Sequence, residues 1–258
     1  MSSWRTGRRL FYLSLVLGFF LVVFLFFYFT IVRKPASCSD NIFNQNELAI
    51  DCGGSCAKVC PFEVSPIIKR WTRFFKISDG KYDVAALVEN PNFGFGIRSL
   101  SYIITLYDRD NSIIVSRSGV TFANPKETFL VFENSLSAGQ RVPVKAIIEF
   151  VGENVWSRVP AGVVMPKTKI QNMSLVEGVL PHLTAEFINE SDLDLTDINL
   201  TTVIYDSDDY AMAVSSTYVN YIRRGEAEEV GFTWALPFAS KAAVRQIYPR
   251  LNIVPAPK

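Results

Sequence analysis

The four cysteines are the residues whose type and spacing first suggest chemistry. Cys38, Cys52, Cys56 and Cys60 lie in one short stretch, and no cysteine follows residue 60. Two disulfides are the favoured interpretation because disulfides persist in an oxidising compartment, and the sequence does not choose among three possible pairings. A zinc site and free thiols are the alternatives, although spacings of 13, 3 and 3 residues lack the usual two-residue zinc knuckle.

Oxygen donors accompany the cysteines. Asp40, Asn44, Glu47 and Asp51 offer carboxylate and amide oxygens, the ligands that calcium prefers. The sequence therefore allows a calcium ion here as the one possible cofactor, although the spacing is not that of an EF-hand loop. The alternative is that these side chains cap turns and remain solvated.

The order of residues around the cysteines is itself distinctive. A Cys-x-Asp begins at Cys38, Asn44 and Glu47 follow, and an Asp-Cys-Gly-Gly begins at Asp51. This order resembles a short cysteine motif found beside membrane anchors and at domain edges in bacterial and archaeal surface proteins. The resemblance implies a small extracytoplasmic knot without a catalytic role.

Catalytic constellations are scarce in the chain. His182 is the only histidine, and no cysteine lies near it in sequence, so a nucleophile with its base is not expected. Aspartates cluster in three polar loops, which could serve an envelope hydrolase but which are also typical of hairpin turns. These aspartates are Asp108 and Asp110, then Asp192, Asp194 and Asp197, then Asp206, Asp208 and Asp209. We therefore expect no enzymatic activity.

Exposed aromatic residues offer one candidate contact surface. Phe93 and Phe95 flank Gly94 just after Asn90-Pro91-Asn92. Proline interrupts strand pairing, so these rings should lie in a loop and be difficult to bury. We predict a contact loop for a partner there.

The element that positions all of these residues in the cell is an apolar segment near the N-terminus. Residues 10–32 contain neither a charge nor a proline, and as a helix they would span about 34 Å, enough to cross a bilayer. A cleaved signal peptide is the alternative, but its apolar region is shorter. Arg5, Arg8 and Arg9 precede the segment, which favours a cytoplasmic N-terminus at residues 1–9.

Charge limits the possible partners. The whole chain carries 26 basic and 25 acidic residues, a net charge of +1, and the part after residue 32 carries −2. Such a balance gives no general attraction to nucleic acid. The expected partners are the lipid bilayer and envelope proteins.

Beyond Pro61 the sequence predicts a mainly β structure. Short runs rich in Val, Ile, Thr, Tyr and Phe alternate with turn residues, and no sustained helical period occurs. The predicted strands of the first half are 67–77, 82–89, 102–107, 113–116, 128–133 and 144–150. The pattern then recurs, because residues 84–90 correspond to 183–189 and 106–108 correspond to 204–206.

A repeat near 100 residues with short strands has the size of an immunoglobulin-like sandwich. We therefore predict one N-terminal transmembrane helix followed by two immunoglobulin- or fibronectin-like β-sandwich domains. The predicted organisation is a Cys-rich segment at 33–61, the first sandwich at 62–160 and the second at 161–258, with a linker within 152–166.

The strand endings carry a second resemblance. A strand that ends in Asn90-Pro91-Asn92, a strand that ends in Leu106-Tyr107-Asp108 and a later Phe-rich strand resemble the late-embryogenesis-abundant type 2 domain and its prokaryotic relative, the Phe-x-Leu-Tyr-Asp domain. The sequence departs from the latter by having Ile104 at the Phe position and Ile204 at the Leu position. The resemblance implies tandem β-sandwiches on a single membrane anchor in a prokaryotic membrane protein, with no catalytic residues.

These features predict a single-pass, membrane-anchored binding or scaffold protein of the cell envelope, with its C-terminal domains outside the cytoplasm. An accessory subunit of a membrane or secretion complex and an envelope hydrolase are the two alternatives.

Overall fold

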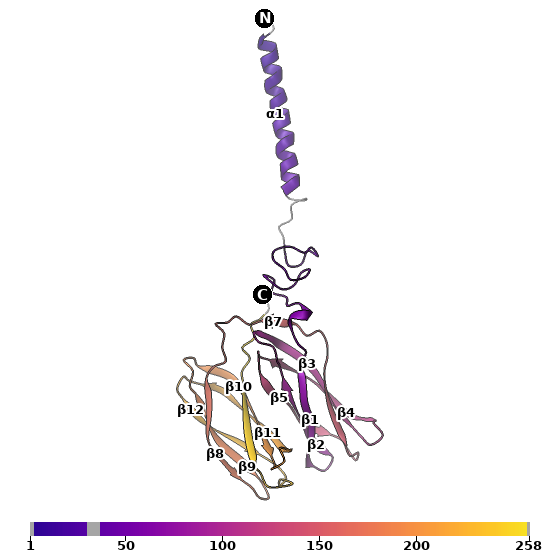
Figure 1. Cartoon of the computed structure of the whole chain (residues 1–258), viewed down its shortest axis with the longest axis vertical. Helices are drawn as coiled ribbons and strands as arrows, with labels where there is room; N and C mark the ends of the chain where they lie inside the picture. Colours follow the sequence, from indigo (N-terminus) through magenta and orange to yellow (C-terminus); the bar gives the residue numbers. More distant parts are fainter. Residues whose placement is uncertain (1–2, 30–36, 257–258) are drawn as a thin grey trace. The chain divides into compact units, whose positions relative to one another are not determined.

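The computed structural model describes residues 3–29 and 37–256 (Figure 1). The chain divides into two units, Met1–Cys56 and Ala57–Lys258, and each is described by itself. The last residues of the predicted membrane segment, 30–32, lie outside the described residues, as do Arg33 and Lys34.

The first unit contains the apolar helix α1, Ser3–Phe27. An 18-residue window within Gly7–Phe27 has a mean hydropathy of 2.8, which makes α1 a candidate membrane span by length and composition. The helix begins before the predicted residue 10, because Ser3–Arg9 contains no proline and arginine is a good helix former. Cys38, Cys52 and Cys56 lie in the same unit, whereas Cys60 belongs to the second unit.

The second unit is built of antiparallel strands and one short helix. The helix is η2, Pro61–Glu63. The strands of the first half are β1 (Ile68–Ser78), β2 (Lys81–Glu89), β3 (Phe95–Tyr107), β4 (Ile113–Ala123), β5 (Thr128–Ser137), β6 (Lys145–Phe150) and β7 (Trp156–Arg158). Those of the second half are β8 (Thr168–Val176), β9 (His182–Asn189), β10 (Leu195–Tyr205), β11 (Ala211–Ile222), β12 (Ala227–Thr233) and β13 (Val244–Arg250).

These strands form two β-sandwiches, so the predicted fold class is confirmed. The first sandwich pairs a sheet of order β1-β2-β5 with a sheet of order β4-β3-β6, and the second pairs β8-β9-β12 with β11-β10-β13. The strand order is thus the same in both sandwiches. The segment predicted as a linker differs from expectation, because it contains β7, which pairs with Phe95–Ile97 of β3 and brings Trp156 against the first core.

Asparagines at equivalent positions of the two sandwiches stabilise equivalent turns. Asn90 at the end of β2 is fully buried and donates its amide hydrogens to the carbonyls of Phe95 (2.8 Å) and Asn124 (2.7 Å). Asn189 at the end of β9 is equally buried and donates to the carbonyl of Leu193 (2.7 Å). The two residues that the sequence places at equivalent positions therefore hold equivalent turns.

Each sandwich has its own apolar core, and a third apolar cluster joins them. In β2, Val84, Ala86 and Val88 belong to the first core, whereas Ala85 and Leu87 point to the opposite face and belong to the third cluster. The alternation of a strand assigns neighbouring residues to opposite faces. Strand β2 is therefore covered on both sides.

The third cluster, which we call the shared cluster, contains side chains of both sandwiches. Its members are Trp71, Phe75, Ala85, Leu87, Leu130 and Phe132 from the first and Val203, Tyr205, Ala211, Val214 and Tyr248 from the second. The outer face of the β1-β2-β5 sheet thus packs against the outer face of the β11-β10-β13 sheet, so that the two sandwiches lie side by side (Figure 1).

A buried arginine reinforces this junction. Arg250 of β13 is 5% exposed and forms an ion pair with Glu127, Nε to Oε1 at 3.1 Å. Its guanidinium also lies 4.0 Å from the ring centroid of Phe122 and 4.1 Å from that of Phe129. Burial lowers the pKa of Arg250, and the charge of Glu127 opposes that effect. A buried charge is tolerated only when it is paired and hydrogen-bonded, so this contact requires both sandwiches.

Candidate functional site

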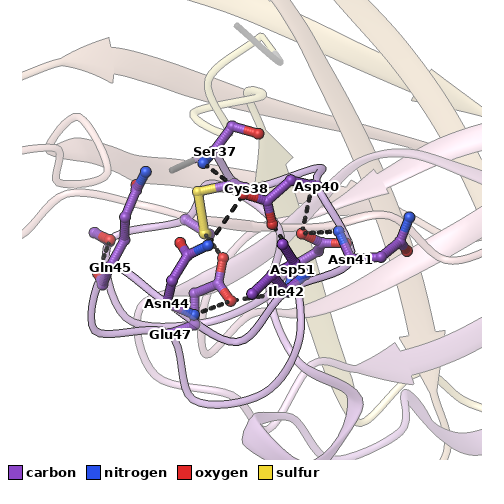
Figure 2. Close-up of a disulfide and its surroundings, with 11 residues drawn as sticks. Ser37, Cys38, Asp40, Asn41, Ile42, Asn44, Gln45, Glu47 and Asp51 are labelled. Atoms are coloured by element: carbon purple, nitrogen blue, oxygen red, sulfur yellow. Dashed lines mark hydrogen bonds between the residues drawn. A yellow bond between two sulfur atoms is a disulfide. The ribbon is translucent and has the colours of Figure 1, made fainter. Parts of the chain in front are cut away.

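All four cysteines are oxidised, as the disulfide interpretation predicted. Cys38 and Cys56 form a disulfide between residues 18 positions apart (Figure 2). Cys52 and Cys60 are also disulfide-bonded, and the described part of the chain, which includes every cysteine, has no free thiol. A thiolate zinc site is therefore absent from these residues.

The carboxylates of the Cys-rich segment face inward and bind backbone N–H groups, as Figure 2 shows. Asp51 accepts hydrogen bonds from the backbone of Asp40 and Asn41, Asp40 accepts them from Ser37 and Ile42, and Glu47 accepts them from Asn44 and Asp51. The distances range from 2.9 to 3.3 Å. Donation from Ser37, and then from the Asn44 side chain, lowers the pKa of Asp40. These side chains hold turns together.

Two oxygen atoms of the predicted calcium set have no N–H or O–H donor among the described residues. Asn44 Oδ1 is buried without a partner. Glu47 Oε1 lies 3.2 Å from Cys56 Sγ, which has no proton because it is disulfide-bonded. Calcium at Asp40, Asn44, Glu47 and Asp51 stays a prediction.

The aspartate-rich hairpins have turn geometry. Asp108 Oδ1 accepts hydrogen bonds from the backbone of Asp110 (3.0 Å) and Ser112 (2.9 Å). In the equivalent turn, Asp206 Oδ1 accepts hydrogen bonds from the backbone of Asp208 (3.0 Å) and Tyr210 (2.8 Å). Asp108 also pairs with Arg141, which lowers the pKa of Asp108. Both carboxylates close their own turns.

The carboxylates of Asp194 and Asp197 in the third aspartate loop also accept hydrogen bonds from nearby groups. Asp194 accepts a hydrogen bond from the hydroxyl of Tyr221 at 2.7 Å and from the backbone of Arg224 at 2.9 Å. Asp197 accepts one from the hydroxyl of Tyr218. His182, the only histidine, is the exposed first residue of β9.

The predicted contact loop is only partly exposed. Phe93 is 70% exposed, and Lys126 Nζ lies 3.8 Å from its ring centroid. Phe95 is half-buried as the first residue of β3, and the guanidinium of Arg158 lies 4.9 Å from its ring centroid. Phe93 therefore presents the accessible ring, whereas Phe95 helps to hold β7.

The largest pocket among those described was not predicted from the sequence. It has a volume of about 680 Å³ and lies between residues 57–66 and the segment 153–157. Val59, Val64, Val155 and Trp156 contribute apolar side chains to it. Because its two sides are almost 90 residues apart in the chain, no local pattern could have revealed it. An apolar concavity of this size is the usual form of a binding site.

Comparison with known proteins adds little to this description. No family model matches the sequence, and no curated protein matches it. One solved structure that matches is the transglutaminase of red sea bream, which is 11% identical over 76% of this chain and 32% of its own chain, with a TM-score of 0.22. The chain therefore spans about a third of that transglutaminase. A likeness this weak carries no argument, and the resemblance to the late-embryogenesis-abundant type 2 domain stays a prediction.

The fold and the sites together define a class of protein. It has a candidate N-terminal membrane span, a disulfide-bonded segment and a body of two β-sandwiches.

Proposed function

We propose that this chain is a single-pass membrane protein of the cell envelope whose extracytoplasmic body binds or scaffolds other envelope components without catalysis. In this proposal the apolar part of α1 that follows Arg9 lies in the bilayer, and residues 1–9 lie in the cytoplasm. The two sandwiches are a tandem duplication related to the late-embryogenesis-abundant type 2 domain.

The observation that carries the proposal is an apolar helix followed by fully oxidised cysteines. Gly7–Phe27 is long and apolar enough to span a bilayer. Disulfides persist outside the reducing cytoplasm, which supports an extracytoplasmic place for Cys38 and Cys56. Arg5, Arg8 and Arg9 on the other side of the apolar run support the same orientation.

Protease treatment of intact cells tests this topology. An epitope tag after Lys258 should be removed by external protease, whereas a tag before Met1 should be removed only after permeabilisation. Protection of the C-terminal tag in intact cells would reverse the proposed orientation and would also contradict the extracytoplasmic location.

Site-specific crosslinking tests the binding role. A photoreactive phenylalanine analogue at position 93 should capture a protein partner in native membranes, because Phe93 is an exposed ring beside a cation. The same analogue at Val142, which is also exposed, is the matched control. Equal capture at both positions, or capture at neither, would count against the contact loop.

A further inference from the structure

A second hollow lies at the junction between the two sandwiches. It has a volume of about 250 Å³. Val120, Phe122 and Phe132 of the first sandwich form one side, and Asn199, Thr201 and Ser216 of the second form the other. We call this hollow the junction groove. The first side also carries the hydroxyls of Tyr102 and Thr121, which are engaged in hydrogen bonds within the protein. The apolar side chains therefore lie mainly on the first side, and the second side bears hydroxyl and amide groups.

The groove exists because the shared cluster covers only part of the β10 face. Val203 and Tyr205 contact the first sandwich within that cluster. Asn199 and Thr201 lie earlier in the same strand, and alternate residues of a strand share a face. Thr201 is buried, whereas Asn199 is exposed and so offers an accessible polar group beside the packed junction.

The charged groups of the groove are neutralised within the protein. Arg250 is paired with Glu127 and donates to the hydroxyl of Thr121 at 2.9 Å. Tyr102 donates its hydroxyl hydrogen to Glu133 at 2.8 Å, and Glu133 is also paired with Arg117. Every charged group among the described lining residues is already paired within the protein. The groove therefore suits a neutral ligand.

Its uncharged polar groups retain hydrogen-bonding capacity. Thr201 donates its hydroxyl hydrogen to Asn199 Oδ1 at 2.9 Å, which leaves the amide hydrogens of Asn199 without an acceptor among the described residues. Ser216 lies opposite Thr201 across β10 and β11, and its side chain is exposed. A hydroxyl can both donate and accept, whereas an amide nitrogen only donates.

We infer that the junction groove binds a neutral saccharide unit, an inference that rests on the proposed binding function. A sugar ring offers hydroxyl groups along its edge, which match Asn199 and Ser216, and a C–H face, which matches Phe122 and Phe132. A ligand that was only apolar would leave the polar wall unpaired at a cost. Both walls together therefore select a molecule with one polar edge and one apolar face.

Saturation-transfer difference NMR on the full chain in detergent tests the inference. The probes are glucose, galactose, mannose and N-acetylglucosamine, with glucuronic acid as an anionic probe. At least one neutral sugar should give a signal and a measurable dissociation constant. Asn199→Ala and Ser216→Ala should each weaken its binding by about two- to tenfold, the loss expected for one hydrogen bond.

Matched controls separate the groove from the rest of the surface. Asn220→Ala and Ser174→Ala remove the same groups at exposed positions outside the groove and should leave the dissociation constant unchanged, with all variants showing the parental melting temperature. Absence of binding by every neutral sugar, preference for the anionic sugar, or equal loss in controls and groove variants would overturn the inference. The protease experiment is independent of this outcome, so the two proposals can fail separately.

Discussion

The side chains of Asn90 and Asn189 show how single residues hold this fold. Each amide is fully buried and satisfies carbonyl groups of the turn that follows its strand. Both asparagines are visible in the sequence as ends of the recurring strand pattern. Their hydrogen-bond partners are not visible, because Asn124 lies 34 residues from Asn90.

Replacing either asparagine should therefore destabilise the protein. Asn90→Ala and Asn189→Ala each leave buried carbonyls unpaired, and we expect a loss of about 1–3 kcal/mol in the free energy of unfolding. Urea unfolding of the full chain in detergent, followed by circular dichroism, measures the loss. Asn154→Ala at an exposed position should change stability by less than about 0.5 kcal/mol, and a comparable loss there would refute the explanation.

Two aspartates should give opposite pH dependences. Arg141 lowers the pKa of Asp108, so Asp108 stabilises the folded state above pH about 3.9, and that stabilisation is lost as the pH falls toward its lower folded pKa. Burial raises the pKa of Asp83, so ionised Asp83 costs stability at neutral pH and the cost disappears on acidification. Melting temperatures between pH 3 and 7 measure both effects.

The corresponding variants give the test its control. Asp108→Asn should lower the melting temperature at pH 7, and its difference from the parent should shrink as the pH falls toward 3. Asp83→Asn keeps the oxygen that accepts the Ser135 N–H and should raise or preserve the melting temperature at pH 7. Shifts of the same sign in both variants would contradict the assignment.

Among the elements, the predicted strands were easier to infer than their packing. Turn residues such as Asp79-Gly80 and alternating apolar runs located the hairpins, and Gly80 has the positive φ of 68° that favours glycine. Strand β7 was missed because three residues, Trp156–Arg158, are too short for a periodic signal. The double burial of β2 and β5 does leave a signal, since residues 84–88 and 129–132 are uninterrupted apolar runs.

The Cys-rich segment should depend on its crosslinks for order. Between Cys38 and Cys56 many apolar side chains are exposed, including Ile42 at 60% and Phe43 at 63%, so the segment lacks a substantial core. The double variant Cys38→Ser with Cys56→Ser should open residues 37–56 to limited proteolysis, because a disulfide closing a loop of this length contributes about 3 kcal/mol. Peptide mapping would locate the cuts.

The strands supply the internal control for this experiment. The sandwiches should remain resistant in the double variant, because their cores do not include Cys38 or Cys56. Unchanged resistance of residues 37–56 would show that other contacts suffice to order the segment.

At the scale of the whole second unit, the shared cluster should make both sandwiches unfold together. Leu130 is 3% exposed within that cluster, and Leu130→Asp would bury an unpaired charge there. We expect calorimetry to show one transition for residues 57–258 in the parent and two in the variant. Val142→Asp, at a position 64% exposed, should keep a single transition.

An unsplit transition in Leu130→Asp with an unchanged melting temperature would mean that the shared cluster does not couple the sandwiches. Such long-range packing could not have been predicted from local sequence. Arg250 illustrates this limit, because its partner Glu127 is 123 residues away.

The shared cluster also has a consequence for biosynthesis. The first sandwich is fully translated at Arg158, the end of β7, but the groups that cover its outer face arrive with β10, β11 and finally Arg250 of β13. At about 5–20 residues per second, roughly 5–20 seconds pass between these events. During that interval Trp71, Phe75 and Leu130 are uncovered, so a nascent chain halted between the sandwiches exposes an apolar face of the kind that chaperones bind.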